Sequence, residues 1–264
     1  MNTANTTAEP NLPSFRLDGQ LALVTGAGGG LGAGIAIGLA EAGAEVVLLG
    51  RTAATLAQTA AVIGKRGAHF HVRVCDVTQS EDLRRVIEEL PRLDVLINNA
   101  GTNFPEPFVQ VSDEHLDLML DLNVRAAFVV AQAAVRKMLE DPERATKGGA
   151  VINISSQMGH VGSPNRTVYC MTKHALEGLT KAMAVELAPK RIRVNSIGPT
   201  FTDTPLVQRI MNTPEKREFM LAKIPMGSLA RVEDIMAAAV YLASPAASMV
   251  TGTHLIVDGG WTAQ

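Results

Sequence analysis

A phenol and an ammonium group lie four residues apart in the segment NRTVYCMTKHA, where Tyr169 precedes Lys173. At about 100° per residue, this spacing places both side chains on one helix face with the apolar Leu176, opposite a polar flank that carries Glu177. A cation within about 4–6 Å of a phenol stabilises the phenolate. The pair therefore predicts proton transfer by Tyr169, with its pKa lowered toward neutrality by Lys173. Taken alone, the pair would favour the alternative, a packed phenol beside a lysine that reaches to water.

A glycine-rich turn changes that balance. The segment TGAGGGLGAGIA, residues 25–36, follows an apolar run, and Gly26, Gly30 and Gly32 have the spacing GxxxGxG. Glycines let the chain turn tightly, let a pyrophosphate approach bare backbone, and start a helix whose first N–H groups face the phosphates. The strict GxGxxG spacing is absent, so a turn without a ligand is the alternative. Its position at the first strand–helix junction favours a dinucleotide site, and such a site favours proton transfer by Tyr169.

The residues after the second and third strands indicate which dinucleotide binds. A site that prefers NAD usually carries an acid about 20 residues beyond the glycine turn, whereas this chain has Gly50 and Arg51 there. An arginine pairs with a 2'-phosphate, and no nearby acid is expected to repel that phosphate, so the sequence predicts NADP(H) over NAD(H). A solvated arginine at a helix start is the alternative. Thr78 and Glu81 match a T-x-x-E capping box, which leaves Asp76 to accept a hydrogen bond from an adenine amino group.

The elements that position these groups alternate along the chain. After a flexible polar leader at residues 1–15, short apolar runs alternate with helical patterns through one domain, residues 16–264. This alternation predicts an α/β fold with a parallel sheet covered on both faces. The predicted strands are 21–25, 45–50, 69–74, 94–98, 150–155, 192–197 and 254–258. The predicted helices are 31–42, 53–65, 79–90, 113–139, 168–188 and 232–243. Residues 200–227 break the alternation as an irregular, methionine-rich segment, where we expect a lid.

Composition narrows the classes of function. Hydrophobic residues make up 47% and charged residues 19% of the 264 residues, which is typical of a globular domain with a sizeable core. With 24 basic and 26 acidic residues the net charge is -2, so we expect no nucleic-acid partner. Two cysteines without CxxC spacing, no secretory signal and no run of about 18 apolar residues favour a cytoplasmic protein without a membrane partner.

His69 and His71 lack an obvious third ligand, so we expect strand packing there and no catalytic metal.

Several motifs, taken in order, resemble the short-chain dehydrogenase/reductase family, in its shorter single-domain branch. They are TGAGGGLG at 25–32, NNAG at 98–101, ISS at 154–156, YCMTK at 169–173 and VDGG at 257–260. The resemblance covers nearly the whole chain. It implies a Rossmann-type, doubly wound sheet of seven strands in the order 3-2-1-4-5-6-7, a nicotinamide cofactor and often a homotetramer.

The resemblance also assigns catalytic roles. Tyr169 resembles the general acid/base, and Lys173 the group that binds the nicotinamide ribose and lowers the tyrosine pKa. Either Ser155 or Ser156 could orient the substrate carbonyl; successive strand residues point to opposite sides, and the family's spacing of thirteen residues before the tyrosine selects Ser156. Asn123 resembles the residue that holds a water linking the lysine to solvent, although alone it would be interpreted as a surface asparagine.

Cofactor and substrate contacts follow from the same resemblance. The implied cofactor-binding residues are Gly26, Gly28, Gly29, Gly30, Leu31, Gly32, Arg51, Asp76, Val77, Asn98, Ala100, Gly101, Tyr169, Lys173, Pro199, Thr200, Thr202 and Thr204. The implied substrate contacts are Ser156, Met158, His160, Tyr169 and Phe201. Thr200 stands where the family usually has glycine, and a β-branched residue resists positive φ, so the path of this loop is open. For Arg166 a rim or subunit-contact role is favoured over binding of a carboxylate.

The reaction implied is hydride transfer between a nicotinamide and a carbonyl carbon, with Tyr169 supplying or taking the proton. The mixture of polar and apolar residues between Ser156 and Tyr169 predicts a small sugar, polyol or oxo-acid substrate. A 3-oxoacyl-thioester reductase is the alternative enzyme. A regulator that binds NADP(H) without turnover is the alternative of another class.

Overall fold

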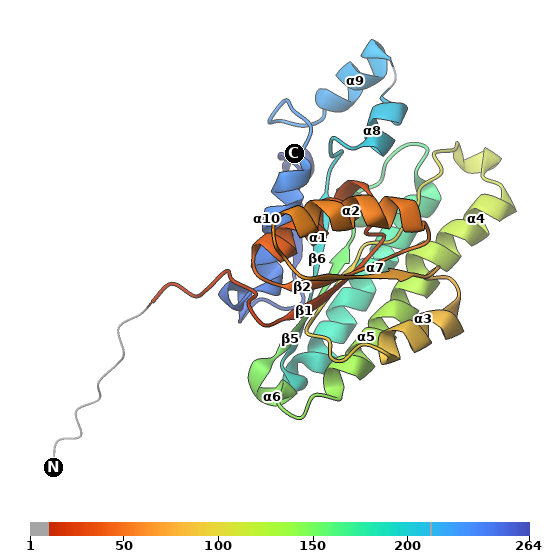
Figure 1. The fold of residues 1–264 in the computed structure, drawn as a ribbon. Coiled ribbons are helices and arrows are strands. Elements are labelled where there is room, and N and C mark those ends of the chain that lie inside the picture. Colours follow the sequence, from red (N-terminus) through yellow and green to blue (C-terminus); the bar gives the residue numbers. More distant parts are fainter. Residues whose placement is uncertain (1–10, 212) are drawn as a thin grey trace.

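The computed structural model describes residues 11–211 and 213–264 (Figure 1). Of the predicted leader, residues 1–10 lie outside the described residues. Residues 11–15 have no regular secondary structure. The carbonyl of Ser14 nevertheless accepts a hydrogen bond from the N–H of Ala246 at 3.1 Å, and the rings of Phe15 and Tyr241 lie 6.2 Å apart. The end of the predicted leader is therefore attached to the body of the protein.

The sheet has seven parallel strands in the order β3-β2-β1-β4-β5-β6-β7, which confirms the predicted order. Its central strands are short runs of Val, Ile, Leu and Ala buried on both faces, as parallel strands require. Every predicted strand is present; β1 and β2 have the predicted ends, and the ends of the others differ by at most two residues. The strands are β1 Leu21–Thr25, β2 Glu45–Gly50, β3 Phe70–Val74, β4 Val95–Asn98, β5 Gly149–Ile154, β6 Ile192–Pro199 and β7 His254–Val257.

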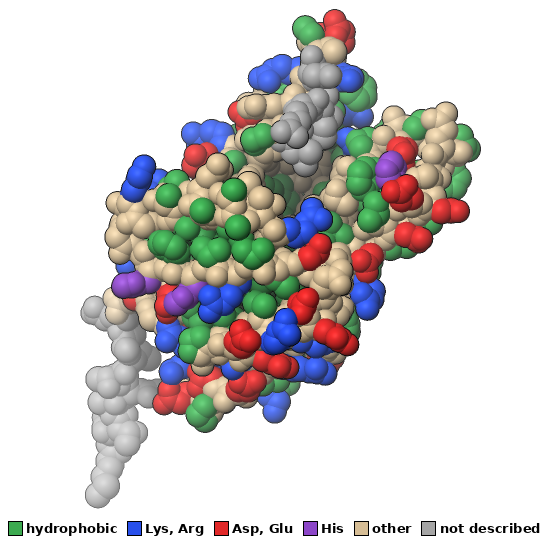
Figure 2. Space-filling view, turned by 45° about the vertical axis from the view of Figure 1, so that its right-hand side comes forward, with side chains coloured by type: hydrophobic (Ala, Val, Ile, Leu, Met, Phe, Trp, Pro, Cys, Tyr) green, Lys and Arg blue, Asp and Glu red, His purple; other side chains and the backbone are tan. Residues whose placement is uncertain are grey.

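Helices cover both faces of the sheet and form two hydrophobic cores. One core joins the sheet to α1 Gly30–Glu41, α2 Ala53–Lys65 and α10 Val232–Ala243. The other joins it to α3 Ser80–Glu88, α5 Ala127–Leu139 and α7 Thr167–Leu187. Two further helices, α4 Asp113–Leu120 and the short α6 Arg144–Lys147, complete this side, on which α4 contacts α7 (Figure 1). Side chains of both charges are interspersed over the face shown in Figure 2.

The helix predicted over 113–139 is continuous but not uniform. A π-helical segment, Asp121–Ala126, separates α4 from α5 and contains Asn123. The segment Asp113–Leu139 is long enough to cross a membrane, and its most apolar window has a mean hydropathy of 1.5, although charged residues interrupt it. More than half of its most apolar window is buried inside the protein, and α5 packs its apolar face into the second core. Its composition is therefore that of a core helix of a parallel α/β sheet.

The predicted lid, residues 200–227, is more regular than its sequence indicated. It contains two helices, α8 Pro205–Ile210 and α9 Pro214–Leu221, which stand apart from the body of the protein (Figure 1). Each begins with a threonine N-cap followed by proline: Thr204 accepts from the N–H of Val207, and Thr213 from that of Lys216. This Thr-Pro pair is a helix-start signal, so the irregular assignment was wrong for a reason visible in the sequence.

Candidate active site

The carboxyl ends of the central strands surround a cavity of about 530 Å³. Parallel α/β sheets bind ligands at this edge, where strand ends, loops and helix N-termini meet. The surface is hollowed beside the segment that carries α8 and α9 (Figure 2). The predicted site residues that line the cavity are Gly26, Gly29, Gly30, Leu31, Gly32, Ala100, Gly101, Ser156, Met158, Tyr169, Lys173, Pro199, Thr200, Phe201, Thr202 and Thr204.

The glycine turn has the geometry of a phosphate cradle. Gly26 and Gly30 have φ values of +67° and +53°, a region that favours glycine. A Cβ at Gly32 would collide with the carbonyl oxygen of Gly26, whereas a Cβ at Gly29 would meet no atom within 4 Å, so open space lies against the backbone there. α1 starts at Gly30 without a side-chain cap, which leaves its first N–H groups for an anionic ligand. The turn therefore fits the pyrophosphate of a dinucleotide.

Asn99, which the sequence analysis did not select, fastens this turn to the adjacent strand end. Its side-chain amide donates to the carbonyl of Thr25 at 2.9 Å. In return, the Thr25 hydroxyl accepts from the N–H groups of Asn99 and Ala100 at 2.9 and 3.0 Å. Asn99 lines the cavity, whereas the predicted Asn98 is buried and donates to the carbonyl of Ala127 and to Asn153. Alternation along β4 points neighbouring side chains in opposite directions, which explains the difference.

Ser156, Tyr169 and Lys173 converge on one wall of the cavity. Tyr169 lies in the first turn of α7 and Lys173 one turn later, so the Lys173 Nζ lies 5.5 Å from the centre of the Tyr169 ring. The Nζ donates to the carbonyl of Ile154, the last residue of β5, at 2.9 Å. Ser156 follows two residues later; its hydroxyl accepts from the N–H of Met158 at 3.1 Å and lies near enough to the Tyr169 phenol to lower its pKa. The predicted pair therefore shares one cavity with the predicted serine.

The predicted lowering of the tyrosine pKa is not found in the polypeptide by itself. Burial raises the pKa of Tyr169 to about 12, and the hydrogen bond with Ser156 and the charge of Arg166 only partly oppose this rise. Burial also lowers the pKa of Lys173 to about 8, against the opposing charge of Glu177. Desolvation dominates because it penalises the charged forms of both groups, and the ammonium donates to a backbone carbonyl instead of the phenol. The neutral phenol is the form that can donate a proton to a carbonyl oxygen.

Asn123 is a buried residue of the π-helical segment, which excludes the surface interpretation. Its Oδ1 accepts from the N–H of Thr102, and its Nδ2 donates to the Thr102 carbonyl, both at 2.8 Å. The Nδ2 also lies 3.2 Å from the hydroxyl of Thr172, the neighbour of Lys173. Asn123 thus joins the cavity wall to α7, and single π-turns of this kind occur frequently at functional sites.

Thr200 is accommodated without the strained backbone that its β-branched side chain would resist. Among the described residues, Asn165 and Arg191 are the only non-glycine positions with positive φ. β6 continues to Pro199, and the N–H of Thr200 donates to the carbonyl of Val257 at 3.1 Å. The buried Thr200 Oγ1 has no partner among the described residues and lies at the cavity wall. An unpartnered hydroxyl there fits a polar cofactor group such as a carboxamide or a phosphate.

Three further residues predicted to bind the cofactor lie outside the cavity lining, namely Arg51, Asp76 and Val77. Arg51 is exposed at the end of β2, and the carboxylate of Asp76 lies 3.8 Å from its guanidinium, so an acid does stand beside this arginine, contrary to the prediction. The predicted capping box is also wrong. α3 begins only at Ser80, because the Asp76 Oδ1 accepts from both the N–H and the hydroxyl of Thr78 in a local turn. Val77 belongs to the second hydrophobic core.

Three further positions differ from what their sequence context indicated. Arg166 is 7% exposed and lines the cavity instead of its rim, and its Nη1 has no hydrogen-bond partner among the described residues. Gly28 lies against α2, where a Cβ would collide with the hydroxyl of Thr55. His160 is exposed, lies outside the cavity lining and stacks on the ring of His254 at 4.2 Å.

The chain is similar in sequence and fold to known proteins over nearly its whole length and theirs. The sequence pattern of the family described as Enoyl-(Acyl carrier protein) reductase, within the short-chain dehydrogenases/reductases, matches residues 26–262. The chain is 39% identical to an L-xylulose reductase from Bos taurus, over 94% of this chain and 99% of the relative. It is 37% identical to a D-threitol dehydrogenase from Mycolicibacterium smegmatis, over 94% and 95%.

Comparison with a solved structure gives the same result. A gluconate 5-dehydrogenase from Burkholderia cenocepacia, in complex with NADP and tartrate, superimposes with a TM-score of 0.90 at 33% identity, over 96% of this chain and 99% of that one. The order of the sequence motifs, the strand order, the cavity and these similarities all indicate the same family. The chain belongs to the short-chain dehydrogenase/reductase family, whose members are oxidoreductases that act on alcohol and carbonyl groups with NAD(P)(H).

Proposed function

We propose that this protein is an NADP(H)-dependent oxidoreductase that interconverts a ketone and a secondary alcohol in a small sugar or polyol. The observation that carries the proposal is the convergence of Ser156, Tyr169 and Lys173 on one cavity beside the glycine turn. The sugar and polyol substrates in the names of its relatives support the substrate class.

The chain's own residues account for the proton and for substrate orientation. A bound nicotinamide supplies or accepts the hydride at its C4 atom. In reduction, Tyr169 donates its proton to the substrate oxygen, and Ser156 donates a hydrogen bond to the same oxygen as negative charge develops. Lys173 holds a positive charge beside the phenol and stabilises the phenolate that remains. In oxidation, the phenolate takes the proton back from the alcohol.

Arg166 supports a substrate rich in oxygen atoms. Burial lowers the pKa of this guanidinium, and its unpartnered Nη1 lies at the cavity wall near Tyr169. Buried donors of this kind need an acceptor, and hydroxyl or carboxylate oxygens of a polyol or sugar acid supply one. An acyl thioester offers few such oxygens near its keto group, so this donor favours the sugar class over the 3-oxoacyl alternative.

A substrate panel tests the proposal. Purified protein is assayed with L-xylulose, D-erythrulose, D-threitol, gluconate and an acetoacetyl thioester, each with both cofactors. We expect the highest kcat/KM on a sugar or polyol. Preference for the thioester would instead establish the 3-oxoacyl alternative, and tight NADPH binding without turnover on any compound would establish the regulator. Arg166→Leu is expected to raise KM for the preferred substrate about tenfold or more, because a charged hydrogen bond is lost.

Arg51 supports the preference for NADP(H). Its side chain is 72% exposed and its ion pair with Asp76 is long at 3.8 Å, so the guanidinium is available to turn toward a 2'-phosphate. We expect Arg51→Ala to raise KM for NADPH by about tenfold to a hundredfold and to leave KM for NADH within about twofold. Asp76→Asn is the matched control, since removing the neighbouring acid should strengthen NADPH binding. Equal losses for both cofactors in Arg51→Ala would contradict the assignment.

We also propose a cytoplasmic homotetramer without a nucleic-acid or membrane partner. Exposed apolar side chains on α4 and α5, among them Leu118, Phe128 and Leu139, support self-association. Light scattering coupled to gel filtration measures the mass, and a monomeric mass at micromolar concentration would refute the assembly.

A further inference from the structure

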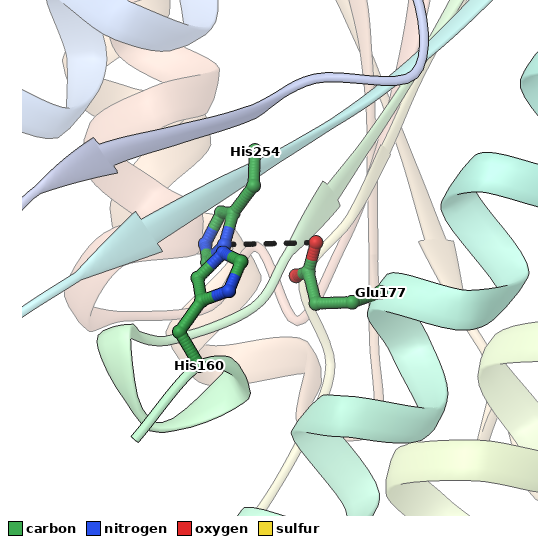
Figure 3. A group of neighbouring side chains, drawn as sticks. All are labelled: His160, Glu177 and His254. Carbon is green, nitrogen blue, oxygen red and sulfur yellow. Dashed lines mark ion pairs between the residues drawn. The ribbon is translucent and has the colours of Figure 1, made fainter.

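Three side chains from distant parts of the sequence meet beside β6, away from the catalytic cavity. His160 follows the short turn Gln157–Gly159, Glu177 lies in the middle of α7, and His254 is the first residue of β7. Their nitrogen and oxygen ligand atoms all lie within 4.8 Å of one another. Figure 3 shows the two imidazole rings stacked, with the carboxylate of Glu177 directed toward them.

Two of the three side chains are buried with polar atoms that lack partners. The side chains of Glu177 and His254 are 6% and 4% exposed. The Glu177 Oε1 and both ring nitrogens of His254 have no hydrogen-bond partner among the described residues, and the His254 Nδ1 lies 3.6 Å from the Glu177 Oε2, beyond hydrogen-bond distance. Buried polar atoms nearly always have a partner. This cluster therefore requires a further group between the side chains.

Two glycines make room for the cluster, and a serine orients its acid. A Cβ at Gly198 of β6 would collide with the His254 imidazole, and one at Gly159 would lie 3.1 Å from the Glu177 Cγ. The Ser196 hydroxyl donates to the Glu177 Oε2 at 2.8 Å, which holds the carboxylate and leaves Oε1 available. Hydrogen bonds of this kind orient the ligands of metal sites.

The charges of the cluster favour a cation over an anion or a second proton. Glu177 would repel an anion. Neither ring nitrogen of His254 has a hydrogen-bond partner among the described residues, so the imidazole can offer a lone pair to a cation. The Lys173 ammonium donates to the carbonyl of Ile154 and forms no direct ion pair with Glu177 among the described residues.

We propose that His160, Glu177 and His254 bind one divalent transition-metal ion of the Zn²⁺ class. Two imidazole nitrogens and one carboxylate oxygen suit Zn²⁺, Co²⁺ or Ni²⁺, whereas Mg²⁺ and Ca²⁺ prefer oxygen ligands alone. Bonds of about 2.0–2.2 Å require the ligand atoms to approach to roughly 3.3 Å, so binding requires the exposed His160 to rotate out of its stack on His254. A water molecule takes the fourth position on the exposed His160 side.

The ion joins three elements around the catalytic wall without taking part in the chemistry. None of its three ligands lines the catalytic cavity, but Met158, two residues before His160, does. Glu177 lies one helical turn after Lys173. The ion therefore links the turn that forms one cavity wall to the helix that carries Tyr169 and Lys173, and both to the edge strand β7. Its effect is on stability, so the site does not depend on which substrate the enzyme uses.

Cobalt binding tests the proposal directly. Untagged, chelator-treated protein is titrated with Co²⁺ and followed by its visible d–d absorption and by calorimetry. We expect one Co²⁺ per chain, displacement by Zn²⁺, a higher melting temperature with either ion, and no rise with equimolar Mg²⁺ or Ca²⁺. The spectrum should lack a thiolate-to-cobalt band, which would indicate binding at Cys75 or Cys170 and overturn the assignment.

A pair of histidine variants locates the site. His160→Ala removes an exposed ligand without disturbing the core, and we expect it to weaken Co²⁺ binding at least about tenfold and to abolish the thermal shift. His174→Ala is the matched control, since His174 is an exposed histidine on α7 outside the cluster and should bind as the unmodified chain does. Equal affinity in the two variants, or no stoichiometric binding in the unmodified chain, would leave a buried water as the partner and overturn the proposal.

Discussion

Lys173 and Glu177 are buried charged residues one turn apart on α7, and the structure treats them in opposite ways. The Lys173 ammonium donates to a backbone carbonyl and faces the catalytic cavity. The Glu177 carboxylate faces the edge of the sheet, accepts one bond from Ser196 and keeps Oε1 unpartnered beside His254. A buried charge is tolerated only with partners. The Lys173 ammonium has its partner within the polypeptide. The Glu177 Oε1 has no partner among the described residues, so we expect a bound group to supply one.

The hydroxyls of the two consecutive serines after β5 differ in the same way: one lies beside Tyr169 and the other on the side of Glu177. Ser156 lies beside the Tyr169 phenol in the cavity and lowers its pKa. Ser155 also lines the cavity, but its buried Oγ lies 3.0 Å from where a Cβ of Gly159 would lie, on the Glu177 side, and has no partner among the described residues. Alternation along an extended chain therefore assigns one hydroxyl to the reaction and the other to the region of Glu177.

The largest effect on kcat is expected from removing the phenolic hydroxyl of Tyr169. Tyr169→Phe removes the proton donor, so kcat should fall by about 10²- to 10⁴-fold. The glycine turn is untouched, so the Kd for NADPH measured by fluorescence titration should stay within about threefold. Turnover within tenfold of the unmodified chain would show that the acid/base lies elsewhere.

The serine pair gives the sharpest contrast between the regions. Ser156→Ala should lower kcat by about 10²-fold, because one donor to the developing oxyanion is lost. Ser155→Ala should change kcat less than about twofold and should not lower the melting temperature, because it removes a buried hydroxyl that has no partner. Both are measured by steady-state kinetics and thermal unfolding. A larger loss of kcat in Ser155→Ala than in Ser156→Ala would reverse the assignment.

The pH profile tests the charge of Lys173 in the free enzyme. Burial lowers the pKa of Lys173 from 10.5 to about 8, so the ammonium loses its proton as the pH rises through that value. The kcat/KM for NADPH reports the free enzyme and should be constant below about pH 7, then fall toward a tenfold loss per pH unit above 8. Tyr169, with a pKa of about 12, stays protonated throughout this range. A profile that is flat to pH 10 would mean that the charge of Lys173 is not required.

A smaller effect on stability is expected in the second region. Gly198→Ala places a methyl group against the His254 imidazole and should lower the free energy of unfolding by about 1–3 kcal/mol. The double variant Gly198→Ala/His254→Ala removes the collision and should recover part of that loss in chemical denaturation. If the single variant is as stable as the unmodified chain, His254 is not packed as described.

Local patterns predicted the strands, because each is a short apolar run between a turn and a helix, whereas their order was implied by the resemblance to the family. The helical periodicity of α7 was less informative. It placed Glu177 on a polar flank, yet this residue is 5% exposed, because α7 packs against β6 on one side and contacts α4 on another. A helical wheel with one apolar stripe assumes that only one face of the helix is buried, so it misassigns residues of a helix that is covered on more than one side.

The sequence by itself determined the parallel α/β fold, the glycine turn and the four-residue spacing of Tyr169 and Lys173, because these depend on neighbours along the chain. Only the tertiary structure decided the direction of the tyrosine pKa shift, since burial raises the pKa of Tyr169 by more than Ser156 and the charge of Arg166 lower it. It alone also brought His160 and His254 to Glu177, across intervals along the chain over which no local spacing rule applies.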